Sequence, residues 1–368
     1  MFFPKLNKIE NVLDKFSRVI EIEPSRCVRL RSKKGIGCGD CIQACPESAI
    51  DVTRNDVLID SAKCSECTIC CKICGSGVFT HKNFSEENFF RKLSEQAAKE
   101  PSVFISCSRS KLTGDEKIIS VPCLAWLDIS VLIFALASGA KRIYLQHEEC
   151  DSCRSLKGGS EIKKEIDEAS RLFRNYLDKN GVEIIAAKAE PQPEPVQAPP
   201  EKESELLTRR ELFGYFRKKT QVSIAQALFY AAESRRFNFT AEVNVVKDKI
   251  KVPMRKRIFN HSVADIFTHL ERSVEISSVR YVSSLEIESA RCDLCGICYK
   301  LCPTGALKEI VTENSEGLMQ KSGISFTTDI CIKCGLCVQL CTSKAISFKM
   351  SVTPEEYVES LKETVAIL

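Results

Sequence analysis

The sequence predicts an α+β multidomain protein in which two small α+β modules flank a small α/β domain and a helical segment. Three observations predict this fold class. Cysteine runs occur as two pairs near opposite ends of the chain, strand-like apolar runs alternate with helical patterns between the pairs, and one segment is rich in proline. The chain has 368 residues, 44% hydrophobic and 28% charged, which suits roughly two to four globular domains.

Each cysteine run leads into a short predicted strand, and changes in composition set the domain boundaries. A small or apolar pair, such as Ala49-Ile50 or Ala345-Ile346, follows the last cysteine of each run by four or five residues. We predict six segments: a cysteine-rich module at 1–82, an α/β domain at 83–187, a disordered proline-rich linker at 188–205, a basic, mainly helical segment at 206–284, a second cysteine-rich module at 285–350 and a C-terminal helix at 351–368.

Cysteine spacing in the second module is typical of [4Fe–4S] ligation. Three cysteines at intervals of three wrap one cube, and a fourth, four residues later, reaches the neighbouring cube. Zinc usually takes two short pairs of ligands instead, and disulfides need an oxidising compartment, for which we find no export signal. The two runs are Cys292, Cys295, Cys298 and Cys302, and Cys331, Cys334, Cys337 and Cys341.

The first module carries a looser copy of this pattern. Its second run is regular, but its first run begins with Cys27, and ten residues separate Cys27 from Cys38. We expect Cys27 to be a displaced ligand under a basic loop; the alternative is that it is no ligand and that this cluster is three-iron or labile. Cys71 lies outside the regular spacing, and we assign it no ligand role. The remaining members of the two runs are Cys41 and Cys45, and Cys64, Cys67, Cys70 and Cys74.

Exchange of the fourth cysteine within each module predicts four [4Fe–4S] clusters. Both modules resemble bacterial two-cluster ferredoxins, over roughly residues 20–80 and 285–350, and the resemblance implies a pseudo-symmetric α+β sandwich around two cubes. The predicted ligands are Cys27, Cys38, Cys41 and Cys74 for cluster one; Cys64, Cys67, Cys70 and Cys45 for cluster two; Cys292, Cys295, Cys298 and Cys341 for cluster three; and Cys331, Cys334, Cys337 and Cys302 for cluster four.

Between the modules, apolar runs and helical patterns alternate as in an α/β domain. Only about ten residues separate the first two strands, which is short for a parallel crossover and argues against a fully parallel sheet. The expected helices begin at Asn83 or Ser85 and cover residues to Lys99, then 124–138 and 160–180; the expected strands cover 102–106, 117–121, 141–146 and 182–186.

Four further cysteines follow these strands. Cys107, Cys123 and Cys150 each come soon after a strand, and Cys153 follows one short turn later. Because the carboxyl ends of parallel strands converge on one crevice, we predict a four-cysteine site there. It can hold an iron–sulfur cluster or a structural zinc, with His147 replacing one thiolate; a redox dithiol at Cys150 and Cys153, or buried thiols without a cofactor, are the other readings.

The order of these features resembles the delta-subunit family of methyl-viologen-reducing hydrogenases, over roughly residues 102–155. The matching positions are Cys107, Cys123, a Gly139-Ala140 helix end and the closing Cys150-x2-Cys153. The family's cysteines hold a [2Fe–2S] cluster, so the resemblance implies a fifth centre here. The sequence departs from the family pattern after Cys107, where the family has a second cysteine and this chain has Arg109 and Ser110.

The rest of the chain offers no second chemistry. Residues 206–260 hold thirteen Lys and Arg against four Asp and Glu, in predicted helices at 209–234 and 255–272. This positive face suits an acidic protein partner or solvent, and we expect no nucleic-acid partner. Residues 121–140 are mostly apolar, but Asp128 near the centre of a lone span would cost about 2.5–3.5 kcal/mol, so we predict no transmembrane segment.

Several one-electron centres without a dinucleotide fingerprint or a Walker loop predict an electron-transfer protein. We expect a cytoplasmic, non-catalytic subunit that relays low-potential electrons to or from a catalytic oxidoreductase partner in anaerobic metabolism. The alternative is a reductase in its own right, which uses the central cysteines on a disulfide or sulfur substrate.

Overall fold

The structure is a computed structural model, and it describes residues 19–32, 37–110, 117–147, 150, 153, 158–188, 249–267, 276–277, 279–315, 317–362 and 365–366. The chain divides into two compact units. Residues 18–189 and 245–368 form one unit, and the other, residues 1–17 and 190–244, lies outside the described residues. The predicted helix at 209–234 and nearly all of the predicted linker at 188–205 therefore fall outside them.

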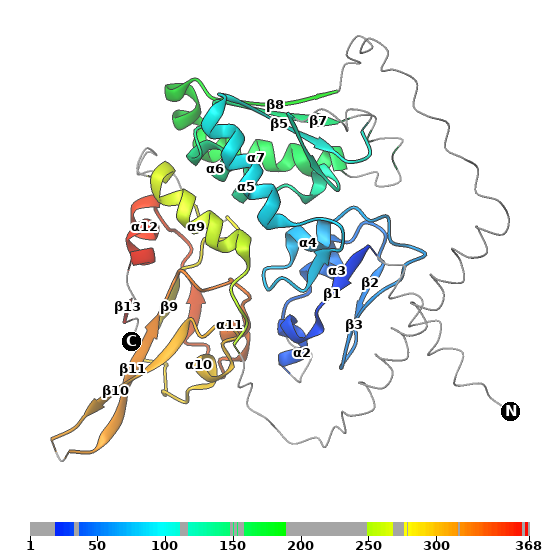
Figure 1. The fold of residues 1–368 in the computed structure, drawn as a ribbon. Coiled ribbons are helices and arrows are strands. Elements are labelled where there is room, and N and C mark those ends of the chain that lie inside the picture. Colours follow the sequence, from blue (N-terminus) through cyan, green and yellow to red (C-terminus); the bar gives the residue numbers. More distant parts are fainter. Residues whose placement is uncertain are drawn as a thin grey trace, which may run out of the picture. The chain divides into compact units, whose positions relative to one another are not determined.

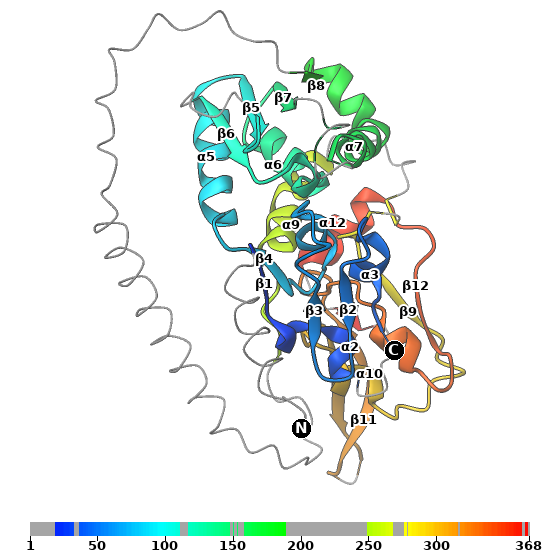
Figure 2. The ribbon, with the colours of Figure 1, turned by 90° about the vertical axis from the view of Figure 1, so that its right-hand side faces the viewer.

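The N-terminal module pairs its first strand with its last (Figures 1 and 2). β1 is antiparallel to β4, and β2 and β3 form an antiparallel hairpin between them. Short helices follow the cysteine loops. The elements are β1 (Ile20–Ile22), α2 (Val28–Arg31), α3 (Asp40–Ala44), β2 (Ile50–Val52), β3 (Val57–Ile59), α4 (Ile69–Ile73) and β4 (Phe79–His81).

The C-terminal module repeats this pairing: β9 with β12, and β10 with β11. Its hairpin is much longer and contains a bulge between Ile310 and Val311. The predicted helix at 351–368 ends at Lys362, because the chain then pairs with β11 as a short strand. The elements are β9 (Leu285–Ile287), α10 (Ile297–Leu301), β10 (Leu307–Glu313), β11 (Met319–Phe326), α11 (Leu336–Leu340), β12 (Ile346–Phe348), α12 (Pro354–Lys362) and β13 (Val365–Ala366).

The α/β domain contains a four-stranded sheet in the order β6-β5-β7-β8, and all its pairs are parallel. The expectation from the short first connection is therefore wrong. The ten residues between β5 and β6 can extend about 33 Å, whereas β6 has only four residues, about 13 Å, so the chain can return without a helix. The strands are β5 (Ser102–Cys107), β6 (Ile118–Val121), β7 (Arg142–His147) and β8 (Glu183–Lys188).

Three helices pack against the buried face of this sheet (Figures 1 and 2). They are α5 (Glu86–Lys99), α6 (Ile129–Ala137) and α7 (Gly158–Asn180). Val103, Ile105, Ile143 and Leu145 alternate toward the core and are fully buried. The predicted helix at 124–138 starts late: after a 3₁₀ turn the chain is extended at Asp128, whose carboxylate accepts a hydrogen bond from the backbone N–H of Ser130 and caps α6.

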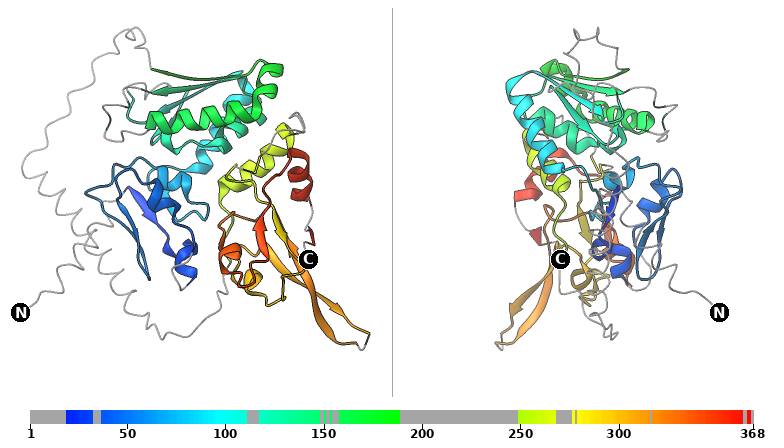
Figure 3. Two further views of the ribbon diagram at one scale, coloured as in Figure 1. Left: turned by 180° about the vertical axis from the view of Figure 1, so that it is seen from behind. Right: turned by 45° about the vertical axis from the view of Figure 1, so that its right-hand side comes forward.

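Helix α9 (Met254–Phe267), which overlaps the helix predicted at 255–272, packs on α6 and α12 (Figure 3). Its Arg255 is buried: the guanidinium pairs with Asp128 at 2.7 Å and Glu86 at 3.0 Å, and stacks 3.9 Å from the ring centroid of Trp126. The N-terminal module has a counterpart in α4, where buried Lys72 pairs with Glu161 and Glu165 of α7. Among the described residues no helix is long and apolar enough to cross a membrane.

Candidate iron–sulfur sites

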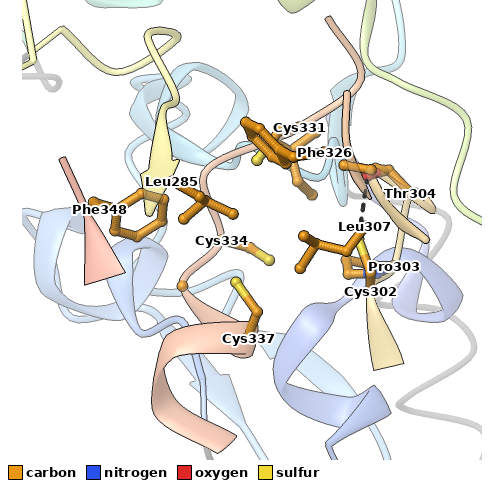
Figure 4. Close-up of a pocket in the computed structure, with 13 residues that line it drawn as sticks. Leu285, Cys302, Pro303, Thr304, Leu307, Phe326, Cys331, Cys334, Cys337 and Phe348 are labelled. Atoms are coloured by element: carbon orange, nitrogen blue, oxygen red, sulfur yellow. Dashed lines mark hydrogen bonds between the residues drawn. The ribbon is translucent and has the colours of Figure 1, made fainter. Parts of the chain in front are cut away.

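A four-cysteine pocket lies in the C-terminal module, lined by Cys302, Cys331, Cys334 and Cys337. Figure 4 shows the four around one space, with the sulfur atoms of Cys334 and Cys337 directed into it. Its other walls are apolar and include Leu285, Leu307, Phe326 and Phe348. The loop carrying three of the cysteines and the turn carrying Cys302 therefore face each other across a mainly apolar cavity. These are the four cysteines predicted for cluster four.

The N-terminal module contains a matching pocket. Cys45, Cys64, Cys67 and Cys70 line it, and these are the cysteines predicted for cluster two. The apolar walls are Ile20, Ile50, Ile59 and Ile69, from β1, β2, β3 and α4. The two pockets thus occupy corresponding places, under the first strand and the central hairpin of each module.

Three cysteine loops have the same backbone conformation. The residues immediately before and after the second cysteine both lie in the left-handed region, which turns the loop back on itself. Glycine takes the second of these positions in the C-terminal module, where it carries no steric penalty, and Thr68 takes it in the N-terminal module. The pairs are Leu294 (φ 53°) and Gly296 (80°), Lys333 (52°) and Gly335 (72°), and Glu66 (58°) and Thr68 (62°).

The fourth cysteine of each run also begins a repeated turn. The residue three positions later has a positive φ in all four runs: Ser48, Gly77, Gly305 and Lys344. The next N–H then donates to the cysteine sulfur, from Ala49 to Cys45 at 3.3 Å, Val78 to Cys74 at 3.4 Å and Ala345 to Cys341 at 3.3 Å. Such bonds stabilise thiolate sulfur.

A hydroxyl two residues after the fourth cysteine contacts the same sulfur in three runs. The distances are 3.4 Å for Cys74–Ser76, 3.8 Å for Cys302–Thr304 and 3.5 Å for Cys341–Ser343. Burial alone would raise the pKa of Cys341, but the Ser343 hydroxyl and backbone N–H groups lower it. The first run has Glu47 at this position instead. Sequence reasoning missed this Ser/Thr recurrence, although it is visible in the spacing.

The predicted cluster one cysteines also come together. Burial raises the pKa of Cys41 to about 12, and the nearby Cys74, Cys38 and Cys27 add to the rise. Cys27 is buried at the N-cap position of α2, and despite the long insert before Cys38 it lies close enough to Cys41 to add to that rise. In the C-terminal module burial raises the pKa of Cys298 to about 11, with Cys292 and Cys295 adding to the rise. Cys341 packs against the same apolar core.

The central cysteines are only partly gathered. A hydrogen bond with Cys123 is the largest cause of the raised pKa of Cys107, followed by burial. Arg109 donates from its backbone N–H to the sulfur of Cys107 and from its guanidinium to that of Cys153, 3.6 Å away. Cys150 lies one turn before Cys153, and its carbonyl oxygen accepts a hydrogen bond from the backbone N–H of Cys153. Arg109, which the sequence marks as a departure from the delta-subunit pattern, thus links two of the predicted cysteines.

The donor sets of the two pockets suit iron. Burial raises the pKa values of Cys67 and Cys334 to about 12, and neighbouring thiols add to both rises. Four thiolates in such an apolar pocket repel one another unless a positive charge joins them, and the iron of a [4Fe–4S] cube supplies it. In the described residues no group of three or more His, Cys, Asp or Glu has the geometry for a single metal ion.

Two regions of the chain match known family models. Residues 284–342 match the model of a 4Fe-4S dicluster domain, and residues 94–192 match that of the delta subunit of methyl-viologen-reducing hydrogenase. No match was found among curated proteins. The chain is therefore an iron–sulfur protein with at least two [4Fe–4S] clusters and a central region related to a hydrogenase delta subunit.

Proposed function

We propose that this chain is an electron-transfer subunit with four [4Fe–4S] clusters and a fifth centre. It relays low-potential electrons to or from a catalytic oxidoreductase partner. The observation that carries the proposal is the repetition of one design at both ends of the chain: the same strand pairing, the same left-handed turns and the same four-cysteine pocket. The dicluster match at 284–342 and the delta-subunit match at 94–192 support it.

The ligands follow the crossed pattern in both modules. Cluster two takes Cys45 with the loop Cys64, Cys67 and Cys70, and cluster four takes Cys302 with the loop of Cys331. Cluster one takes Cys27, Cys38, Cys41 and Cys74, and cluster three takes Cys292, Cys295, Cys298 and Cys341. The central Cys107, Cys123, Cys150 and Cys153 hold the fifth centre, which the delta-subunit relationship favours as [2Fe–2S] over zinc.

Each cluster supplies one-electron chemistry when it is bound. The chain's own residues do the rest: thiolates hold the iron, backbone N–H groups and hydroxyls donate to sulfur, and apolar walls keep water out of the two pockets. Thiolates that are bound to iron are not available to a substrate as nucleophiles, and this fits conduction better than catalysis.

Iron content tests the proposal. Anaerobically purified protein should hold about 16 iron atoms, or about 18 with a central [2Fe–2S]. Cys67→Ser and Cys334→Ser should each lose about four, whereas Cys71→Ser, the matched control beside a predicted ligand, should lose none. A content of 8 or fewer in the unaltered protein would refute the assignment of clusters to both modules.

A second candidate function rests on the Cys107–Cys123 contact. Two hydrogen-bonded thiols can form a disulfide, and so can pass two electrons and two protons to a disulfide substrate, giving two thiols. Turnover of a small disulfide by the reduced protein, lost in Cys107→Ser and in Cys150→Ser, would favour this reductase over a pure relay. Undiminished turnover in both variants would rule it out.

A further inference from the structure

We infer that the five centres of the proposed relay form one row, in the order central site, cluster two, cluster one, cluster four, cluster three. This inference rests on the proposed function and adds the sequence of transfer and the end at which a partner makes contact. Electron tunnelling through protein weakens steeply with distance, so the order follows from which cysteine sets are neighbours.

The central site adjoins cluster two. Cys67 and Cys123 belong to one small buried cluster that also contains Ile69 and Ala125. Cys123 adds to the raised pKa of Cys67, whose main cause is burial. Arg109 spans the same boundary: its guanidinium reaches the Ser65 carbonyl at 3.2 Å and Glu66 at 3.6 Å, both in the cluster two loop. The same guanidinium contacts Cys153 on its other side.

Clusters two and one adjoin within the N-terminal module. The fourth ligands, Cys45 and Cys74, are exchanged between them. Burial raises the pKa of Cys41, and Cys70 of cluster two is among the neighbouring thiols that add to the rise. Cys41, Cys70 and Cys74 all pack against one apolar core.

Clusters one and four meet across a seam between the two modules. Val28, next to Cys27, is buried with Ile332 and Leu336 of the cluster four loop. A Cβ added to Gly75, which follows Cys74, would lie 3.1 Å from the carbonyl oxygen of Ile332, so the two backbones are in close contact.

Electrostatic interactions and hydrogen bonds also indicate that the two modules are in contact at this seam. Burial raises the pKa of Cys334, and Cys38 of the other module adds to the rise. Arg26 donates to the carbonyl of Lys251 at 2.8 Å, and Arg280 donates to that of Ile73. Both bonds hold the N-terminal module against the segments around the C-terminal module. The seam therefore brings ligands of clusters one and four together, while cluster two faces the central site.

The row ends at cluster three. Cys298, Cys302, Cys331 and Cys341 pack into the single core of the C-terminal module, which joins cluster four to cluster three. Of the 21 cysteines, all of which the structure describes, only Cys295 is exposed. Cluster three is thus the outer terminal for a one-electron protein carrier. Each step moves one electron and no proton: the centre that gives the electron is oxidised by one and the centre that receives it is reduced by one.

Magnetic interaction between reduced clusters tests the order without any activity measurement. Cys67→Ser with Cys298→Ser should leave clusters one and four, and dithionite reduction should give an electron paramagnetic resonance spectrum broadened by their interaction. Cys41→Ser with Cys298→Ser should leave clusters two and four, and here the signal of cluster four should lack that broadening, because cluster two interacts with the central site instead. Equal broadening of the cluster four signal in both variants, or none in the first, would overturn the order.

Iron analysis of the same samples separates this inference from the proposed function. Absence of iron from the N-terminal module would refute the four-cluster proposal. If each double variant keeps the iron of its two remaining clusters but clusters one and four do not interact, only the order is refuted. If the double variants do not fold, Gly75→Val in the otherwise unaltered holoprotein should remove the one–four part of the broadening. A Cβ added to Gly39, which is beside Cys38, would lie 3.9 Å from the Gln43 side chain, with no other described atom beyond its chain neighbours within 4 Å. Gly39→Ala should therefore leave the broadening unchanged. Retention of all broadening in Gly75→Val would also refute the order.

Discussion

The two cysteine modules have the same strand pairing but differ where their ligand loops begin. In the C-terminal module both loops have regular spacing and the paired left-handed residues. In the N-terminal module only the second loop does; the first replaces this turn with Cys27 at the cap of α2 and an insert before Cys38. The dicluster match covers the regular module. The same strand pairing therefore occurs both in the module that matches the dicluster model and in the N-terminal module, whose first loop departs from the regular cysteine spacing.

The largest expected loss of iron that tests this difference between the modules concerns Cys27, the displaced cysteine. Cys27→Ser should lose about four iron atoms if Cys27 is a ligand, as much as Cys292→Ser at the regular position of the other module. The measurement is iron content together with the spectrum of the reduced protein. No loss of iron, with a three-iron signal already present in the unaltered protein, would show that Cys27 is no ligand.

A second comparison concerns two buried cations that pair with carboxylates of the α/β domain, Arg255 of α9 and Lys72 of the N-terminal module. The side chain of Arg255 is 5% exposed and that of its partner Asp128 is 4% exposed. The side chain of Lys72 is 3% exposed, but those of its partners Glu161 and Glu165 are 18% and 21% exposed. The Arg255 pair is thus fully removed from water. Burial tends to raise the pKa of Asp128, yet Arg255 and hydrogen bonds from Ser130 and Tyr281 lower it.

Arg255→Met should therefore lower the free energy of unfolding by about 3–5 kcal/mol, because it leaves Asp128 charged and buried. Lys72→Met should cost less, about 1–3 kcal/mol, since water reaches both of its glutamates. The measurement is anaerobic urea unfolding. Arg257→Met, at an exposed position of the same helix, is the control and should change stability by no more than about 0.5 kcal/mol. Equal losses at Arg255 and Lys72 would contradict the difference in burial.

The sequence predicts the periodic parts of this chain and misses what depends on tertiary partners. Cysteine spacing predicts the four-cysteine sets, and the structure brings Cys302 to the loop of Cys331 and Cys45 to that of Cys64. The late start of α6 at Asp128 was not predicted, because the partner that stabilises this cap, Arg255, is 127 residues away. The parallel β5–β6 pair was missed because strand length, not loop length alone, decides whether a connection can return.

The smallest effects concern hydroxyls beside the fourth cysteines. Ser343 contacts Cys341, a predicted ligand of cluster three, whereas Glu47 occupies the equivalent place after Cys45, a predicted ligand of cluster two. A hydroxyl that donates to sulfur favours the reduced, more negative cube, and a carboxylate near it disfavours that state.

Ser343→Ala should lower the potential of cluster three by roughly 20–60 mV, the equivalent of one net hydrogen bond in a one-electron couple. Glu47→Ser should raise that of cluster two by a similar amount. Ser347→Ala, whose hydroxyl bonds to Glu286 on an exposed strand, is the matched control and should shift neither. Redox titration followed by electron paramagnetic resonance measures all three.

If Ser343→Ala lowers the potential of cluster three and Glu47→Ser raises that of cluster two, the modules differ in their cluster potentials as well as in their loop spacing. The Glu47 carboxylate then holds the potential of cluster two lower. Shifts of the same sign would show that the residue two places after the fourth cysteine does not tune either cluster through its charge.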